Sequence, residues 1–295
     1  MSSMKKLSPF ILLIAIIAII AFSFWLFPWV RPAWFSGELS KNQVVDLVEE
    51  SLEFNDASNG IFTLAPGFRL SVFSDEVINP RVMIFDQNGS MLVSETSANR
   101  VSLIDNGGER ITLLSGLNLP HGLAIKNDKL YVAETGRIVS YDYDGVQAVN
   151  PVVVLDLPVG GRHFSRTIGF GPDGRLYISI GSSCNICIET DWRRTKILAY
   201  DLEKQDLKVH ASGLRNAVFF SWQPTTGKMF ASEMGRDWLG DLLPPDEVNV
   251  IEAGGDYGFP FCYGKNILDP EFSVAAQCQS SQPSLFDLKA HEAPL

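Results

Sequence analysis

Acidic side chains gather in one short stretch of this sequence, between residues 233 and 247. Five carboxylates fall in a segment that is also rich in glycine and proline: Glu233, Asp237, Asp241, Asp246 and Glu247. Carboxylates and free backbone carbonyls on a stiff loop are the ligands that a hard cation such as Ca²⁺ prefers. A solvated acidic loop is the alternative interpretation. Just upstream, Arg215 and Asn216 provide a cation and an amide that can both bind an anionic ligand.

A histidine with basic neighbours is the second candidate for chemistry. His163 lies in the segment VGGRHFSR, residues 159–166, where two glycines allow the backbone to turn tightly. A histidine at the mouth of a site can accept a proton near neutral pH, although a purely structural histidine remains open. Five arginines lie in or near these segments: Arg162, Arg166, Arg193, Arg194 and Arg215. They could form a positively charged mouth for an anionic small ligand, or they could be solvated surface residues.

These candidates occupy repeated positions in the chain. Four strand–turn–strand segments recur at roughly 40 to 50 residues, the interval typical of a propeller blade: residues 82–95, 122–134, 167–180 and 218–233. A third apolar segment follows each one, at residues 100–105, 137–142, 196–201 and 247–251. Strands without intervening helices exclude a doubly wound fold. We therefore predict an all-β chain, a β-propeller with about four blades, with a β-sandwich as the alternative.

Polar residues recur directly before each repeated hairpin. They are residues 79–81, 119–121, 163–166 and 214–216, and they include His121, His163 and Arg215. A propeller brings such loops together around a common axis. We therefore expect an imidazole, a guanidinium and the acidic loop to meet at one site, with His121 among the predicted ligand contacts.

Length, charge and the N-terminal segment suggest location and partners. The 295 residues carry a formal charge of -10, which argues against nucleic acid as a partner. After Lys5 and Lys6, the apolar stretch Pro9–Val30 could extend about 33 Å as a helix, enough to cross a bilayer. Its aromatic end favours an uncleaved anchor over a signal peptide. We predict an anchor at residues 1–35, a helical linker at 36–60 and a propeller domain at 61–295, outside the cytoplasm.

The cysteines are consistent with an exported domain. An even number in such a domain indicates disulfides: Cys184, Cys187, Cys262 and Cys278. A Cys262–Cys278 bond would close a loop near the C-terminal end. The CNIC segment lacks the histidine needed for haem attachment and the βαβ context of a redox dithiol. A local disulfide or a pair of free thiols remains open there.

Four motifs, in order, resemble those of the pyrroloquinoline quinone (PQQ)-dependent sugar dehydrogenases, the soluble glucose and sorbosone dehydrogenase family. They are LRNAV (214–218), EMGRDWLG (233–240), PPDEVN (244–249) and GGDYGFP (254–260), and residues 166–187 resemble the sorbosone branch. The resemblance runs from about Leu64 to the end. It implies a six-bladed propeller that holds PQQ and Ca²⁺. It also implies about two further blades, so we expect the chain to be incomplete at its C-terminus. Because the positive-inside rule keeps Lys5 and Lys6 in the cytoplasm, we expect the propeller to face the periplasm from the inner membrane of a bacterium.

The resemblance also implies roles for individual residues. His163 would take the substrate hydroxyl proton, Arg215 would polarise the quinone oxygen, and Asn216 would bind the cofactor. Ca²⁺ would be held by the carbonyls of Gly235 and Arg236 and by the carboxylate of Glu247. The implied reaction moves a hydride from a sugar or sugar aldehyde to the quinone, and electrons then pass to a respiratory acceptor. A non-catalytic binding propeller and a calcium-dependent lactonase are the alternatives.

Overall fold

The protein is described by a computed structural model over residues 64–272 and 276–290. The chain divides into two compact units, residues 1–72 and 73–295. The predicted anchor at Pro9–Val30 and the predicted linker at 36–60 lie outside the described residues. Within the described ranges, no helix is both long and apolar enough to cross a bilayer.

Four antiparallel sheets follow one another along the second unit, and we call each one a blade. Blade 1 consists of β1 (Pro80–Phe85), β2 (Met91–Glu95), β3 (Arg100–Ile104) and β4 (Arg110–Ser115). Blade 2 consists of β5 (Leu123–Lys126), β6 (Lys129–Glu134), β7 (Arg137–Tyr143) and β8 (Ala148–Asp156). Blade 3 consists of β9 (Ile168–Phe170), β10 (Leu176–Ile180), β11 (Lys196–Asp201) and β12 (Asp206–Ser212). Blade 4 consists of β13 (Ala217–Trp222), β14 (Met229–Glu233), β15 (Asp246–Ile251) and β19 (Phe286–Leu288).

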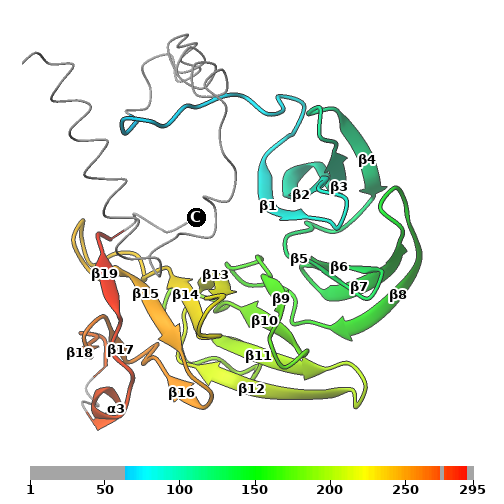
Figure 1. Cartoon of the computed structure of the whole chain (residues 1–295). Helices are drawn as coiled ribbons and strands as arrows, with labels where there is room; N and C mark the ends of the chain where they lie inside the picture. Colours follow the sequence, from blue (N-terminus) through cyan, green and yellow to red (C-terminus); the bar gives the residue numbers. More distant parts are fainter. Residues whose placement is uncertain (1–63, 273–275, 291–295) are drawn as a thin grey trace, which may run out of the picture. The chain divides into compact units, whose positions relative to one another are not determined.

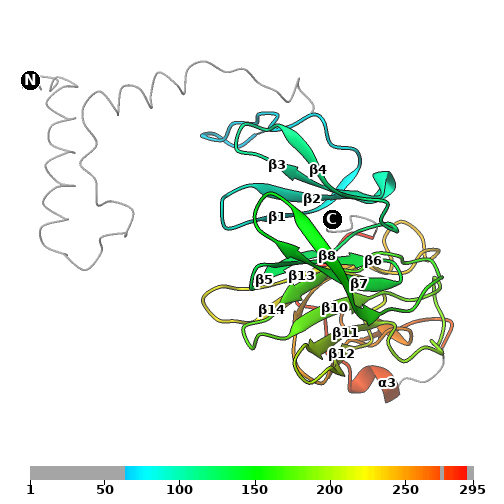
Figure 2. The same cartoon turned by 90° about the vertical axis from the view of Figure 1, so that its right-hand side faces the viewer.

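The blades are arranged around a common centre with their first strands innermost (Figure 1). Seen from the side, the sheet β1–β4 lies above β5–β8, which lies above β9–β12 (Figure 2). This arrangement confirms the predicted propeller and excludes the β-sandwich. The predicted third segments are the strands β3, β7, β11 and β15. The fourth strand of each blade was not predicted.

Aspartate and glycine shape the hairpin turns. Asp86 Oδ1 accepts hydrogen bonds from the backbone N–H groups of Asn88 and Ser90, and Gly89 between them has φ +81°. Asp105 makes the same pair of bonds in the turn between β3 and β4. Such a side chain replaces backbone partners that the turn leaves open, and glycine supplies the left-handed conformation. The turns therefore follow directly from local sequence.

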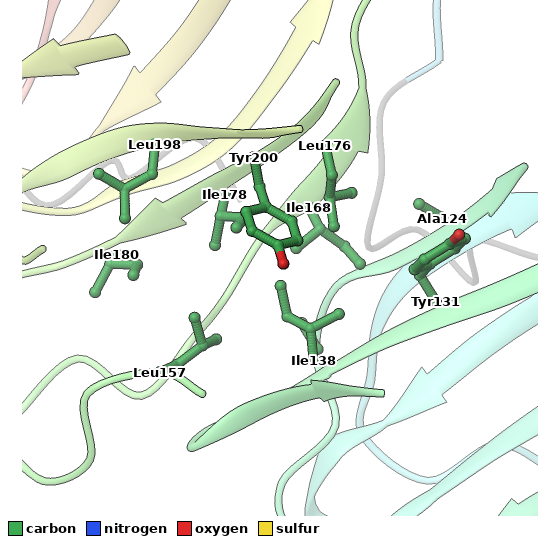
Figure 3. Packing of buried hydrophobic residues seen from close by; sticks show 11 residues of the cluster. Ala124, Tyr131, Ile138, Leu157, Ile168, Leu176, Ile178, Ile180, Leu198 and Tyr200 are labelled. Carbon is green, nitrogen blue, oxygen red and sulfur yellow. The ribbon is translucent and has the colours of Figure 1, made fainter. Parts of the chain in front are cut away.

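The hydrophobic core lies between blades. Figure 3 shows the layer between blades 2 and 3, in which Tyr131 and Ile138 of one sheet meet Leu176, Ile178 and Tyr200 of the next. Equivalent apolar layers join blade 1 to blade 2 and blade 3 to blade 4. Burial of these facing side chains is the main force that fixes the order of the blades.

A long excursion separates β15 from the last strand of blade 4. It contains β16 (Gly255–Asp256), which pairs with β12 in parallel, the hairpin of β17 (Cys262–Tyr263) and β18 (Ile267–Leu268), and the short helix α3 (Ala276–Gln279). The other short helix of the described chain is the 3₁₀ turn η1 (Thr96–Ala98). Disulfides join Cys262 to Cys278 and Cys184 to Cys187, which confirms the predicted pairing and decides the open question about the CNIC segment.

Candidate active site

Three loops of blades 3 and 4 meet at Gly181, the residue that follows β10. A Cβ atom placed on Gly181 would lie 2.6 Å from Oδ1 of Asn216 and 2.8 Å from Cβ of His163. The N–H of Ser182 donates a 2.7 Å hydrogen bond to the carbonyl of Arg215. The fold therefore brings together three residues that the sequence predicts as one site: His163, Arg215 and Asn216.

Replacing Gly181 by alanine is expected to destabilise the chain by about 1–3 kcal/mol, because the new methyl group would overlap two neighbours. Urea unfolding of the two proteins measures this loss. Gly107→Ala is the matched control, since a Cβ there meets no atom closer than 3.3 Å. Equal effects of the two substitutions would show that the contacts at Gly181 are not tight.

His163 is held in one tautomer. Its Nδ1 lies 2.9 Å from the carbonyl oxygen of Ser182 and 3.0 Å from the Ser182 hydroxyl. That hydroxyl donates to the carbonyl of Cys184, so both Ser182 oxygens can act as acceptors toward the ring. Because a carbonyl can only accept, Nδ1 carries the hydrogen and Nε2 keeps its lone pair. Burial, with the positive charge of Arg215, lowers the pKa of His163 to about 4, so the ring is neutral at pH 7.

Arg215 is buried and most of its hydrogen-bonding capacity is used by the protein. Nε donates to the carbonyl of Asn185 and Nη2 donates to its Oδ1, each over 2.8 Å. Nη1 donates to the carbonyls of Met234 and Gly235, over 3.2 and 2.8 Å. Four of the five guanidinium N–H groups are thus engaged within the described chain, which leaves one Nη2–H for a ligand.

Three of the predicted mouth arginines have structural roles instead. Arg166 is fully buried and donates to the carbonyls of Pro158, His163 and Ser165. Arg194 is also buried and donates to the carbonyls of Val159, Gly160 and Gly181. Arg193 pairs with Asp191 over 2.7 Å. The prediction of a mouth lined by all five arginines was wrong, because Arg166 and Arg194 brace the loop that carries His163 and Arg193 is paired with Asp191.

Arg162 remains at the surface beside the site. Its Nη1 lies 3.8 Å from Oδ2 of Asp237, and its guanidinium lies 5.5 Å from the centre of the Trp238 ring. The same Asp237 oxygen is 3.9 Å from Nη2 of Arg215. One carboxylate therefore lies between the two arginines that face the site.

A buried glutamate ends the second strand in three of the four blades. In blades 1 and 2 an ion pair with arginine neutralises this glutamate, because the strand register places Glu95 opposite Arg100 and Glu134 opposite Arg137. In blade 4 the equivalent pair is Glu233 and Glu247, two buried carboxylates. Burial, with the like charge of Glu247, raises the pKa of Glu233 well above its usual value.

A small cavity lies between these two glutamates. It has a volume of about 20 Å³, room for one water or ion, and its lining includes Arg215, Gly235, Arg236, Tyr263 and both glutamates. Oε1 of Glu233 accepts from the Asn216 N–H, whereas Oε2 has no hydrogen-bond partner within the described chain. The carboxylates of Glu233 and Glu247 face one guanidinium, that of Arg215. One negative charge is left, and a bound proton or a bound cation can neutralise it. Oxygen donors at such a site fit a hard cation.

The three residues predicted to bind Ca²⁺ all line this cavity. Glu247 also accepts hydrogen bonds from the side chain of Asn249 and the backbone of Gly264. The Gly235 carbonyl accepts from Arg215, and its second lone pair stays open to a cation. The Arg236 side chain points to acidic partners, with Nε 2.7 Å from Asp269, so only its carbonyl can act as a ligand.

Glu233 is the cavity residue that sequence reasoning did not single out. It appeared only as one of five acidic residues, and the structure separates these by burial: Glu233, Asp246 and Glu247 are buried, Asp237 is half-buried and Asp241 is exposed. A signal was present in the repeats, because the residue paired with the end of the second strand is basic in blades 1 to 3 (Arg100, Arg137 and Lys196) and is Glu247 in blade 4. Loss of the basic residue in one repeat marks the unusual blade.

His121 is fully buried and its ring stacks on Phe219, with centroids 5.7 Å apart. Neither ring nitrogen has a hydrogen-bond partner among the described residues. Burial, with the charge of Arg81, lowers its pKa to about 4. The structure places His121 against β13, the strand that Arg215 and Asn216 precede, and its contact with a cofactor stays a prediction.

Comparison with known proteins gives concordant findings. A sequence model of the family described as TrAA12-like matches residues 62–295. A PQQ-dependent sugar dehydrogenase of Hypocrea jecorina is 27% identical over 245 residues, which cover 68% of this chain and 56% of that protein. The chain spans 56–64% of the length of the curated relatives it matches.

Two solved structures share the fold. The holo form of the pyranose dehydrogenase PQQ domain from Coprinopsis cinerea has a TM-score of 0.67 at 19% identity, covering 78% of this chain and 70% of that one. The calcium structure of a Trichoderma reesei carbohydrate-active enzyme of family AA12 has a TM-score of 0.65 at 22% identity, covering 72% and 68%. At these identities the likeness shows the propeller fold alone.

Proposed function

Because the chain belongs to the TrAA12-like family over residues 62–295, we propose that it oxidises a sugar or a sugar aldehyde, with PQQ as hydride acceptor and Ca²⁺ beside it. The relative from Hypocrea jecorina is named a PQQ-dependent sugar dehydrogenase. One observation carries the proposal: a neutral imidazole, a buried guanidinium and a carboxylate-lined cavity lie in one corner of blades 3 and 4.

The residues present fit both groups. PQQ is a planar polycarboxylate, and the site offers it the remaining Nη2–H of Arg215, the surface guanidinium of Arg162 and the amide of Asn216. Both arginines also lie within 4 Å of Asp237 Oδ2. Gly181 has no side chain, which lets His163 and Asn216 both pack against its backbone. The oxygen donors of Glu233 and Glu247 and the carbonyls of Gly235 and Arg236 would hold Ca²⁺.

The chain's own residues would act on a proton and on developing charge. Bound PQQ would supply the electron-accepting quinone. Nε2 of His163 would accept the proton of the substrate hydroxyl, since the Ser182 carbonyl fixes the hydrogen on Nδ1. The remaining Nη2–H of Arg215 would stabilise negative charge on the acceptor oxygen in a buried setting, where such a bond is strongest. The protein already holds both groups by hydrogen bonds.

Reconstitution tests the proposal. The purified chain, incubated with PQQ and CaCl₂, is expected to bind PQQ, change the quinone absorbance when an aldose or sorbosone is added, and reduce a redox dye. Absence of PQQ binding and of an absorbance change would contradict the proposal and favour a binding propeller. Hydrolysis of a lactone without quinone would favour a calcium-dependent lactonase.

We also propose that the propeller works in the periplasm, anchored to the inner membrane by the N-terminal segment, and passes electrons to a respiratory acceptor. Two disulfides within the described chain support an oxidising compartment. A C-terminal alkaline phosphatase fusion that stays inactive in cells would contradict this location.

A further inference from the structure

The loop that follows β10 contacts both His163 and Arg215 of the candidate site. Ser182 binds Nδ1 of His163, and the carbonyl of Ser183 accepts the N–H of Arg162 over 2.9 Å. The next residues form the disulfide ring from Cys184 to Cys187, whose inner residues include Asn185. This ring lies in the chain between the segments that carry the proposed base and the guanidinium.

Asn185 makes four hydrogen bonds to two separate segments. Its carbonyl and Oδ1 accept from Nε and Nη2 of Arg215, each over 2.8 Å. Oδ1 also accepts the N–H of Asp237 over 2.8 Å, and Nδ2 donates to the Asp237 carbonyl over 3.2 Å. The pattern fixes the amide orientation, because a flipped amide would place its NH₂ against two other donors. Asn185 is buried, so water cannot replace these bonds.

The ring has support that keeps Asn185 in place. The Ser182 hydroxyl donates to the Cys184 carbonyl over 2.7 Å, on one side of the ring. On the other side, the Glu189 carboxylate accepts the hydroxyl of Ser183 over 2.9 Å. With the disulfide, these contacts restrict a loop that has no regular secondary structure. Binding sites depend on this kind of support, because it holds the residues that orient the ligand-contacting groups in a fixed position.

We infer that Asn185 is the positioning residue for Arg215 and for the Asp237 loop, held for this purpose by the Cys184–Cys187 ring. The inference rests on the proposed function, since it assigns Arg215 to the cofactor. Two of the four bonded N–H groups of Arg215 end on Asn185. Without the Asn185 side chain, the Nη2 end of the guanidinium would lose its protein acceptor, and the N–H meant for a ligand would lose its direction.

The test compares variants of the whole chain by two measurements. Asn185→Leu is expected to weaken PQQ binding about 10- to 100-fold in the presence of CaCl₂, as loss of a supporting contact does at bound cofactors and metals. In the cofactor-free protein, hydrogen exchange of residues 234–239 is expected to speed up at least tenfold, because the Asp237 N–H loses its acceptor. Asn185→Asp keeps Oδ1 and should restore most of both properties. Cys184→Ser/Cys187→Ser should act in the same direction as Asn185→Leu.

Tyr143→Phe is the matched control, because it removes a buried 2.8 Å hydrogen bond to Asp86 between blades 1 and 2. It should leave PQQ affinity and the exchange of residues 234–239 unchanged. Equal PQQ affinity of wild type and Asn185→Leu, or no rescue by Asn185→Asp, would overturn the inference. If the wild type binds no PQQ, the proposed function fails, and the exchange measurement alone decides whether Asn185 holds the Asp237 loop. If Asn185→Leu does not fold, the aspartate and serine variants carry the same comparison.

Discussion

Replacing His163 by alanine is expected to lower kcat for sugar oxidation by about 10²- to 10⁴-fold, while PQQ affinity stays within a few-fold of wild type. The imidazole is proposed to take the hydroxyl proton through Nε2, and no other base among the described residues occupies its place next to Gly181. Steady-state dye reduction and a PQQ titration measure the two quantities on the same preparation.

His210→Ala is the control for this substitution. His210 is half-buried on β12, where its ring packs edge-on against Tyr177, and it should be silent in turnover. Equal losses in both variants would indicate a general effect of removing a histidine. Unchanged turnover in His163→Ala would contradict its role as the base.

The pH dependence of the wild type follows from the same residue. A base works in its unprotonated form, and burial lowers the pKa of His163 to about 4 in the free protein. The group therefore stays active as pH falls from 8 to about 5 and is lost below that, and kcat/KM should fall only on the acid side. A fall centred near pH 6.5, the ordinary histidine value, would show that His163 is solvated or is not the base.

Calcium is expected to stabilise the wild-type chain and to lose this effect in Glu247→Gln. A ligand at 100 times its dissociation constant adds about 2.7 kcal/mol to the free energy of unfolding. Removing one carboxylate from a cavity with few ligands should raise the calcium concentration needed for that gain at least tenfold. Thermal unfolding at increasing CaCl₂, with and without a chelator, measures the difference.

Glu233→Gln distinguishes a proton from a calcium ion as the group that neutralises the cavity. Without calcium it should be as stable as wild type or more stable, because it removes a buried like charge next to Glu247. With calcium it should lose stabilisation, because Oε2 is a proposed ligand. Asp241→Asn, an exposed acid of the same loop, should behave as wild type. Loss of the calcium effect in Asp241→Asn, or its retention in Glu247→Gln, would contradict a cation site in the cavity.

Much of the fold was predictable because its signals are local. The repeated hairpins are short β-rich segments joined by turns of Gly, Asn and Asp, and both features are properties of neighbouring residues, as at Asp86 and Gly89. The fourth strands were missed although β8 contains the apolar run Val152–Leu155. They are outer strands, and most side chains of β8 are exposed.

The site was predictable in its members but not in their partners. The repeat placed His163 and Arg215 at equivalent loop positions, and the fold brings those loops together. Glu247 instead lies on β15 and shares the cavity lining with Arg215. The fate of the arginines was not predictable, because the carbonyls that surround Arg166 and Arg194 belong to a loop whose path only the tertiary structure sets. Asn185 was missed for the same reason, since its partners lie 30 and 52 residues away.

The shared apolar layers have a consequence for how the molecule comes apart. Each hydrophobic core cluster is shared by two adjacent blades. Separating one sheet from its neighbour would therefore expose the apolar faces of both sheets to water. Loss of order should therefore spread from blade to blade as in a linear array with nearest-neighbour coupling, rather than remain in one sheet. Blades 3 and 4 carry the candidate site, and a defect in blade 1 reaches them only after crossing two such junctions.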